Sequence, residues 1–255
     1  MQLKEKIMKH YQGEAQKHGL EGTSTIQDMR TRKLEMDALF SYVKDGQRIL
    51  EIGCGNGYLA QALVERFAVQ LEATDLSEDL IGLAKNRKPQ NARGSVKFAQ
   101  ADVLAMQQTD QYDLIFTERC IQNLVSWDDQ KIALANIVRA LKPGGTFVML
   151  ESFLTGKDNL NAARRELDLP EVETPWHNVW FDEDNTKDHM KSLGCTYVDQ
   201  NAFLSGYYFG SRVLLPALSP NKMVTSKSVL NDYFCGLPPH GDFCPMKILR
   251  FRKGK

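Results

Sequence analysis

The chain has 255 residues, of which 42% are hydrophobic and 25% are charged, as in an ordinary soluble globular protein. Lysine plus arginine equals aspartate plus glutamate, at 32 each, so no basic field marks nucleic acid or acidic lipid as a partner. Apolar runs fall short of the ~20 residues of a membrane span, and the first residues lack the apolar core of a signal peptide.

Two amphipathic helices are predicted before the first strand. Apolar residues recur every four positions over residues 3–15, and Gly19 interrupts that stripe. A second helix is predicted to begin at Thr23 or Ser24 and to run to about residue 43.

Residues 48–58 predict a buried strand that passes through three alternate glycines into a helix. Residues 49–52 are apolar except for Glu51, as in a parallel strand that is buried on both faces. Gly53, Gly55 and Gly57 let the backbone turn sharply and approach a ligand closely. Their spacing differs from the Gly-x-Gly-x-x-Gly of dinucleotide-binding proteins. The pattern predicts a cofactor loop of the nucleotide-binding type.

Strands and helices then alternate, which predicts a parallel, doubly wound α/β sheet. Further strands are predicted at residues 71–75, 96–103, 112–118 and 146–150, then at 196–198 and 246–252. Asp75 ends the second strand at the position where nucleotide-binding sheets place an acid for the ribose diol. Asp102 stands just beyond the third strand. Residues 155–183 interrupt the alternation, and residues 201–245 are predicted to be irregular.

The run Glu51-x-Gly-x-Gly-x-Gly, followed by Asp75 and Asp102, resembles the class I S-adenosylmethionine-dependent methyltransferases, of the bacterial stand-alone small-molecule type. The resemblance covers residues 47–153 and the last strand. It implies a seven-stranded, mostly parallel, Rossmann-like sheet in a single domain over residues 1–255. A helical cap (1–46) and two insertions (154–183 and 201–245) would cover the cofactor-binding core (47–153).

The resemblance also implies S-adenosylmethionine as cofactor and a set of residues that hold it. Asp75 would accept hydrogen bonds from the ribose, unless it only caps a helix. Asp102 would accept one from the adenine amino group, unless it only caps a turn. Glu51 would orient the glycine loop or meet the methionine ammonium, and Tyr11 would close over the cofactor or pack as a core aromatic. The predicted cofactor residues are Glu51, Gly53, Cys54, Gly55, Asn56, Gly57, Asp75, Leu76, Ala101, Asp102, Val103, Glu118 and Tyr11.

A methyl acceptor that is an alcohol must lose a proton, and histidine is the usual base near neutral pH. His177 lies in an aromatic run inside the first insertion, so it is the predicted base, with a structural role as the alternative. Glu151, at the end of the fifth strand, is the second candidate, and His240 is a third. The predicted substrate-binding residues are Trp176, Trp180, Tyr207, Tyr208 and Arg212, of which the last two also fit a helical packing face.

We therefore expect in-line methyl transfer to a small molecule or a glycan, with oxygen favoured over nitrogen as the atom methylated. An RNA or protein methyltransferase is the alternative within the class, and the Asn-Pro-Pro-Tyr type motif of nucleic-acid amino methyltransferases is missing at residues 117–120. A nicotinamide-dependent oxidoreductase or a non-catalytic cofactor-binding module is the alternative outside it. Five scattered cysteines suit reduced thiols in the cytoplasm and argue against a disulfide framework or a metal site. The oligomeric state stays open.

Overall fold

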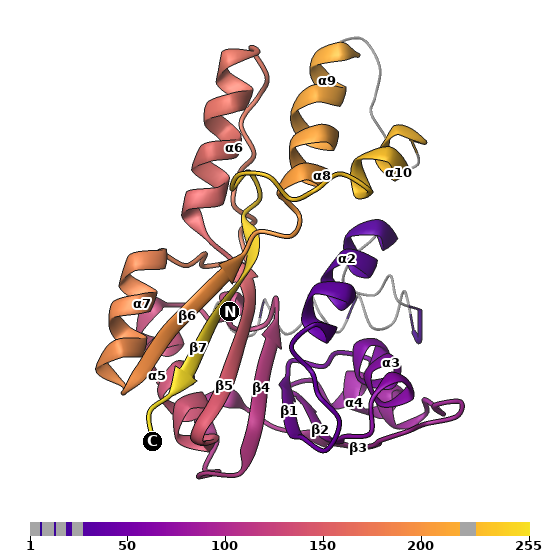
Figure 1. The fold of residues 1–255 in the computed structure, drawn as a ribbon, viewed down its shortest axis with the longest axis vertical. Helices are drawn as coiled ribbons and strands as arrows, with labels where there is room; N and C mark the ends of the chain where they lie inside the picture. The colour runs from indigo at the N-terminus through magenta and orange to yellow at the C-terminus, as the bar shows by residue number, and fades with distance from the viewer. Residues whose placement is uncertain (1–5, 7–12, 14–18, 22–27, 220–227) are drawn as a thin grey trace.

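The computed structural model describes residues 6, 13, 19–21, 28–219 and 228–255, and the structural statements below concern these residues. Tyr11 and nearly all of the first predicted helix lie outside them. Within the described chain, one sheet runs in the order β3-β2-β1-β4-β5-β7-β6 (Figure 1). Its strands are β1 (Arg48–Ile52), β2 (Gln70–Asp75), β3 (Ser95–Gln100), β4 (Tyr112–Glu118), β5 (Leu141–Ser152), β6 (Cys195–Asn201) and β7 (Met246–Lys253).

The first five strands pair in parallel, and β7 pairs antiparallel with both β5 and β6. The predicted seven-stranded, mostly parallel sheet is therefore confirmed. From β1 the chain adds β2 and β3 on one side, and it then returns to the other side of β1 to form β4. The strand order therefore reverses between β1 and β4. Ligands of open α/β sheets bind beyond the carboxyl ends of the strands at such a point.

Helices cover both faces of the sheet, so its central strands bury apolar side chains on both faces. Ile49 packs in a cluster with residues of α2 (Met29–Phe40), α3 (Tyr58–Arg66) and α4 (Glu78–Lys85). Leu50, the next residue on β1, packs in a second cluster with residues of α5 (Trp127–Ala140) and α7 (Glu183–Ser192). Neighbouring side chains of a strand point to opposite faces, so each apolar residue of β1 serves one cluster.

Polar side chains cap the start of some of the described helices. Ser77 Oγ accepts a hydrogen bond from Leu80 N at the start of α4, and Ser126 Oγ accepts one from Asp129 N at the start of α5. The prediction that α2 begins at Thr23 or Ser24 is wrong, because the helix begins at Met29 with Asp28 as its N-cap. None of the described helices is both long and apolar enough to cross a membrane.

The first insertion contains α6 (Leu154–Glu166), which extends beyond the sheet, and an extended segment that returns beside it (Figure 1). We call residues 170–180 of that segment the strap. Side chains of α6 hold the strap: Asn161 exchanges two hydrogen bonds with the backbone of Val172, at 2.8 and 3.1 Å, and Arg164 Nε donates to Pro170 O at 2.6 Å. At its other end, Val179 N donates to Gln122 O at 2.7 Å.

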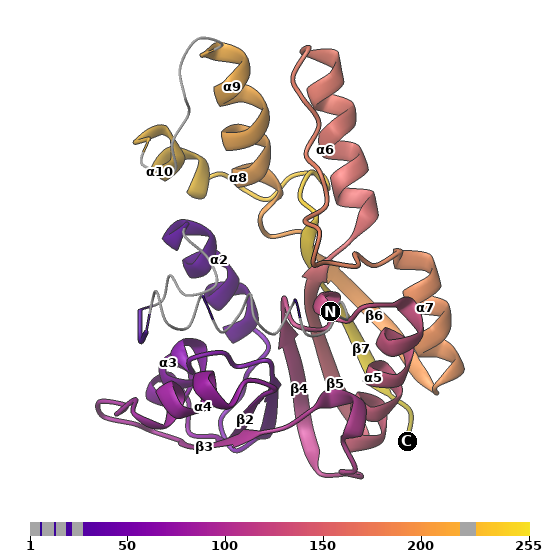
Figure 2. The same ribbon diagram turned by 180° about the vertical axis from the view of Figure 1, so that it is seen from behind.

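The described residues of the second insertion include several short helices, so the prediction that the segment is irregular is wrong for those residues. It contains α8 (Ser205–Phe209), a π-helical turn η3 (Gly210–Leu214), α9 (Leu215–Leu218) and α10 (Leu230–Cys235), which lie above the sheet in Figure 2. Pro216 has no N–H to donate to the carbonyl of Arg212 four residues earlier. Arg164 of α6 donates to that carbonyl instead. The proline and the wide turn disturb the 3.6-residue period, which hid the helix from sequence inspection.

Candidate cofactor and acceptor site

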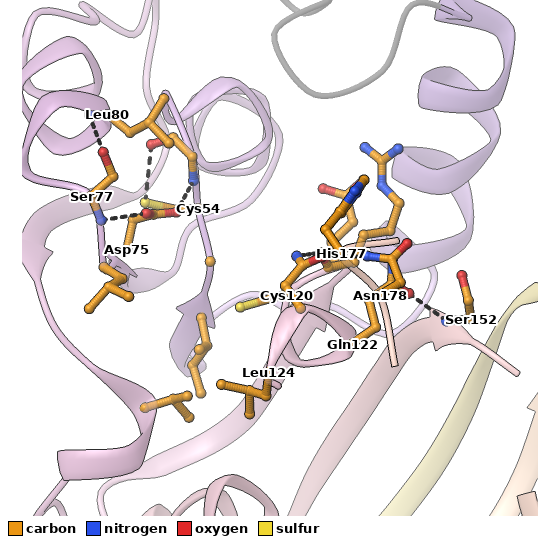
Figure 3. Close-up of a pocket in the computed structure, with 18 of the residues that line it drawn as sticks. Cys54, Asp75, Ser77, Leu80, Cys120, Gln122, Leu124, Ser152, His177 and Asn178 are labelled. Atoms are coloured by element: carbon orange, nitrogen blue, oxygen red, sulfur yellow. Dashed lines mark hydrogen bonds between the residues drawn. The ribbon is translucent and has the colours of Figure 1, made fainter. Parts of the chain in front are cut away.

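A cavity of about 670 Å³ lies at the carboxyl ends of β1 to β4, where the strand order reverses. This volume is within the range of ligand pockets in proteins. One end, the loop end, is lined by the loops that follow β1, β2 and β3. The other, the strap end, is lined by the segment after β4, by the strap and by Tyr208 of α8. Figure 3 shows Cys54 and Asp75 at the loop end, well separated from His177 and Asn178 at the strap end.

The glycine loop is held by the neighbouring strand and is open toward the cavity. Gly53 N and Cys54 N both donate to Thr74 O, at 2.7 and 2.9 Å. Gly53, Gly55 and Gly57 all have positive φ, of 82°, 54° and 76°. A Cβ at Gly53 would clash with Cys120 and one at Gly57 with Phe98, whereas one at Gly55 would meet nothing within 4 Å. Close packing therefore requires the outer two glycines, and Gly55 leaves the backbone accessible to a ligand.

The Asp75 carboxylate joins the glycine loop to the segment after β2. Its Oδ2 accepts from Gly55 N at 2.9 Å and its Oδ1 from Ser77 N at 2.8 Å (Figure 3). Burial raises the pKa of Asp75, and the N–H groups of Ser77 and Gly55 oppose that shift. The N-cap of α4 is Ser77, so Asp75 is not a simple helix cap. A carboxylate oxygen accepts more than one hydrogen bond, so both oxygens retain capacity for a diol.

Beside Asp75 the cavity has an apolar wall with one carboxylate at its edge. Leu76, Ala101 and Val103 line it as predicted residues, and Leu104 lines it as well. Asp102 also lines the cavity, and its Oδ1 accepts from Leu104 N at 2.9 Å at the start of the short turn η1 (Val103–Ala105). The turn-capping role of Asp102 is thus present, and its carboxylate also lies at the cavity.

Glu51 lies behind the glycine loop and is not among the residues that line the cavity. Its side chain is buried, and its Oε2 has no hydrogen-bond partner among the described residues. Burial, with the nearby carboxylate of Glu118, raises the pKa of Glu51 well above its usual range. A buried acceptor of this kind suits an ammonium group that enters from the cavity.

A buried cluster of four charged residues lies where α2 meets the end of β4. Arg32 Nη1 bonds to both carboxylate oxygens of Glu118, at 2.8 and 2.9 Å, and both residues line the cavity. Arg119 Nε lies 3.6 Å from Oε1 of Glu35, which is fully buried. Burial raises the pKa of Glu35 to about 8. Although burial also acts on Glu118, Arg32 and Arg119 hold the pKa of its carboxyl below the usual value.

Polar groups surround His177 at the strap end. Asn178 Nδ2 donates to Asn123 Oδ1 at 2.6 Å, and Trp180 Nε1 donates to Asn178 Oδ1 at 3.4 Å. The cavity is lined by all four of these residues, Asn123, His177, Asn178 and Trp180. Trp176 does not: its side chain is 52% exposed, and its ring faces that of His177 with 5.2 Å between centroids. The prediction that Trp176 forms part of the substrate wall is therefore not supported by its position.

Glu151 lies behind the cavity, whereas the suggested role as base would require its side chain to line the cavity. Its side chain is fully buried and does not line the cavity. Its carboxylate accepts hydrogen bonds from the backbone N–H groups of Cys120, Ile121 and Gln122, at 3.1 to 3.2 Å. Burial raises its pKa to about 7. Glu151 thus shapes the segment after β4 from behind, and this placement argues against it as the base.

Of the three residues predicted from the second insertion, only Tyr208 lines the cavity. Tyr207 is buried, and its hydroxyl donates to Asp28 Oδ2 at 2.5 Å. Arg212 lies over the rings of Tyr207 and Tyr208, 5.2 and 4.5 Å from their centroids, and 3.5 Å from Asp28. Tyr207 and Arg212 therefore join α8 and η3 to Asp28 at the start of α2, and for Arg212 this is the packing role that the sequence left open.

The two cysteines of the cavity are protonated thiols. Burial raises the pKa of Cys54 and of Cys120 well above the usual range. A protonated thiol is a poor nucleophile. Within the described chain no group of three or more His, Cys, Asp or Glu side chains is placed to hold a metal ion.

Sequence reasoning missed several polar residues that line the cavity. They are Ser77, Asp79, Gln122, Asn123, Asp129, Ser152, Glu173 and Asn178. Gln122, Asn123 and Asn178 carry no motif, and only their position after β4 or inside the aromatic run pointed to this edge of the sheet. His240 is not among the residues that line the cavity.

Residues 49–145 match the family described as "Methyltransferase domain". The chain is 35% identical over 107 residues to phosphoethanolamine N-methyltransferase 2 of Caenorhabditis elegans, covering 42% of this chain and 24% of that protein. It is 33% identical over 111 residues to the O-methyltransferase rstn1 of Aspergillus nomiae, covering 43% and 48%. The matched segments thus span a quarter to a half of these relatives.

The fold has close counterparts over nearly its whole length. A TehB-like SAM-dependent methyltransferase from Corynebacterium glutamicum superposes with a TM-score of 0.56 at 17% identity, covering 97% of this chain and 99% of that one. The sheet order and the helices on both faces define a Rossmann-like fold. Residues 49–145 thus match a methyltransferase domain, the family that the glycine and aspartate pattern resembles, and the sheet order agrees with that match.

Proposed function

We propose that this protein binds S-adenosylmethionine at the loop end and transfers its methyl group to a small-molecule or glycan acceptor at the strap end. The observation that carries the proposal is one continuous cavity. Gly55, Asp75 and Asp102 line the same cavity as His177 and Asn178. Two reactants that share a cavity can be held in the alignment that an in-line displacement requires.

The residues of the loop end fit the parts of the cofactor. Asp75 offers both carboxylate oxygens to a ribose diol, and Asp102 offers one to an adenine amino group. Leu76, Ala101 and Val103 supply the apolar wall for the base. The open backbone at Gly55 and the buried oxygen of Glu51 suit the amino-acid portion.

Bound there, S-adenosylmethionine would supply an electrophilic methyl carbon on a positively charged sulfur. The chain itself must then orient the acceptor and remove its proton. Nδ1 of His177 is buried, so Nε2 is the nitrogen that would take a proton from an acceptor hydroxyl. Asn123 and Asn178 would hold acceptor polar groups, and Trp180 and Tyr208 would keep water from the reacting atoms.

Methylation of oxygen is favoured because an imidazole, the side chain that most often accepts a proton from a hydroxyl, lines the strap end. An amine acceptor would not require it, since a neutral amine is already a nucleophile. Relatives named for N- and for O-methyl transfer are about equally similar to this chain. N-methylation is therefore the first alternative. RNA or protein methylation ranks below it, because insertions line the acceptor side of the cavity.

Calorimetry tests the cofactor first. The protein should bind S-adenosylmethionine and its demethylated product, and should not bind NAD at comparable concentration. Incubation of a panel of alcohols, amines and sugars with labelled S-adenosylmethionine, followed by mass spectrometry, then identifies the acceptor and the methylated atom. Binding of NAD in place of S-adenosylmethionine would overturn the proposal, and labelled RNA or protein in a lysate would move it to the alternative.

A further inference from the structure

Three consecutive backbone carbonyls, those of residues 19–21, accept hydrogen bonds from Asn56 of the glycine loop and from Arg87. Asn56 Nδ2 donates to Gly19 O at 2.8 Å and to Glu21 O at 2.9 Å. Arg87, which follows α4, donates to the carbonyl of Leu20 between them. In an extended strand, successive carbonyls point to opposite sides. The turn at Gly19, whose φ of 51° is left-handed, lets all three face the same way.

Arg87 joins this turn to the wall of the cavity. Its Nε donates to Asn56 O at 2.6 Å, and its Nη1 donates to Gln61 Oε1 of α3 at 3.1 Å. Its guanidinium lies over the ring of Tyr58, 5.3 Å from the centroid. Asn56 and Tyr58 line the cavity, whereas Arg87 does not. One guanidinium therefore contacts the turn, the glycine loop and the first residue of α3.

We propose that Asn56 and Arg87 form a latch that holds residues 19–21 against the glycine loop and thereby slows release of the bound cofactor. This inference rests on the proposed function and assigns Arg87 a positioning role, since Arg87 acts through Asn56 and Tyr58. It also changes the role predicted for Asn56. The side-chain amide of Asn56 serves the N-terminal turn, which leaves its backbone for the cofactor.

The latch is chemically specific. Glycine loses more conformational freedom than any other residue when it is ordered, so three positive-φ glycines make this loop costly to hold in one conformation. Hydrogen bonds from a guanidinium are charge-assisted and presented in a fixed planar fork, so Arg87 bonds two carbonyls at little further entropic cost. A lysine at this position would carry the charge without the fork.

A surface plasmon resonance experiment with S-adenosylhomocysteine tests the latch. Arg87→Ala should release the ligand about tenfold faster, the change expected from losing ~1.4 kcal/mol of anchoring, with an association rate close to wild type. Asn56→Ala should behave similarly. The double variant should fall short of the product of the two effects, because both side chains hold the same turn. Arg87→Lys should be intermediate.

Arg93→Ala is the matched control. Arg93 also donates to a backbone carbonyl, that of Arg66, and pairs with Asp45, away from the cavity. Its release rate should equal that of wild type. Thermal unfolding verifies that each variant is folded.

Wild-type release rates in folded Arg87→Ala and Asn56→Ala would overturn the latch and leave the proposed function intact. Failure of the wild-type protein to bind S-adenosylhomocysteine or S-adenosylmethionine would overturn both.

Discussion

The two ends of the cavity are built by different means. At the loop end, positions are set by backbone hydrogen bonds between adjacent strands, such as those of Gly53 N and Cys54 N to Thr74 O. At the strap end, the wall is held by side chains of α6, such as Asn161, which bonds both backbone groups of Val172. The loop end is therefore part of the sheet, and the strap end depends on a few side chains outside it.

Because of this difference, the two ends of the cavity differ in how freely their residues can vary between proteins with this fold. Any sequence that forms the parallel sheet brings the ends of β1, β2 and β3 together, so a shared cofactor can be bound by many chains with this fold. The strap and α8 are not required by the sheet, so they are free to differ between acceptors. The four predictions that follow test this division, from the largest expected effect to the smallest.

His177→Ala should lower the turnover number by about 10²- to 10⁴-fold, the usual contribution of a general base, with little change in affinity for S-adenosylmethionine. The reason is that His177 belongs to the strap end alone. Steady-state kinetics and calorimetry measure the two quantities. His189→Ala is the control, because that ring packs on Trp127 outside the cavity. Undiminished turnover in His177→Ala would mean that the acceptor needs no base.

Asp75→Asn should weaken binding of S-adenosylmethionine by about tenfold to a hundredfold, because hydrogen bonds to a charged group contribute roughly 1.5 to 3 kcal/mol. The substitution keeps the shape of the side chain but places an amide N–H where Gly55 or Ser77 donates. Titration calorimetry measures the change, with the surface variant Asp184→Asn as control. Equal affinity in the two variants would remove Asp75 from the cofactor site.

Glu35→Gln should alter the pH dependence of the protein's stability. Glu35 belongs to the buried charged cluster where α2 meets the end of β4. The folded protein keeps a proton on Glu35 up to about pH 8, whereas an ordinary glutamate loses it near 4.5. The wild-type protein therefore loses stability as the pH rises from about 4.5 to about 8, and this loss is complete above that range.

Glutamine cannot ionise, so the Tm of Glu35→Gln relative to wild type should rise between pH 5 and pH 9. The rise should exceed the roughly 2 to 4 °C that 1 kcal/mol produces in a chain of this size, because a pKa change from 4.5 to about 8 is worth several kcal/mol. Calorimetric scans across that range measure the difference. Asp37→Asn, on the exposed face of the same helix, should show no such trend. A constant difference in Tm would show that Glu35 does not retain its proton.

Trp176→Ala should change turnover and acceptor KM by no more than about twofold, because its side chain is half exposed and does not line the cavity. Trp180→Ala, four residues along the strap, should raise the acceptor KM clearly more, since Trp180 lines the cavity. The two variants compared in one assay show which face of the strap meets the acceptor. A larger effect at Trp176 would reverse that assignment.

The sequence predicted the sheet and the loop end because both follow from local patterns. Apolar strands, alternate glycines and an acid at the end of the second strand need only the chain order to be placed at one edge of the sheet. The strap end did not follow in this way. His177 and Trp180 were found through an aromatic run, whereas Asn123 and Asn178, 55 residues apart, meet only in the folded chain.

The predicted site residues that do not line the cavity have a common physical explanation. Glu151, Tyr207 and Arg212 are residue types that work in active sites, and in this chain they bond to backbone or to Asp28 behind the cavity. A buried charge must be paired wherever it lies, so the need for a partner does not distinguish a site from a core.

By itself the amino-acid sequence determined the class of fold, the position of the glycine loop and the placement of Asp75 at the end of β2. Strand periodicity and the backbone freedom of glycine are local properties, so they can be recognised in the sequence. Only the tertiary structure decided which polar side chains face the cavity, how α6 holds the strap and that Arg87 reaches the turn at Gly19. Those outcomes depend on the direction in which each side chain leaves a packed element, and residues far apart in the chain settle that direction together.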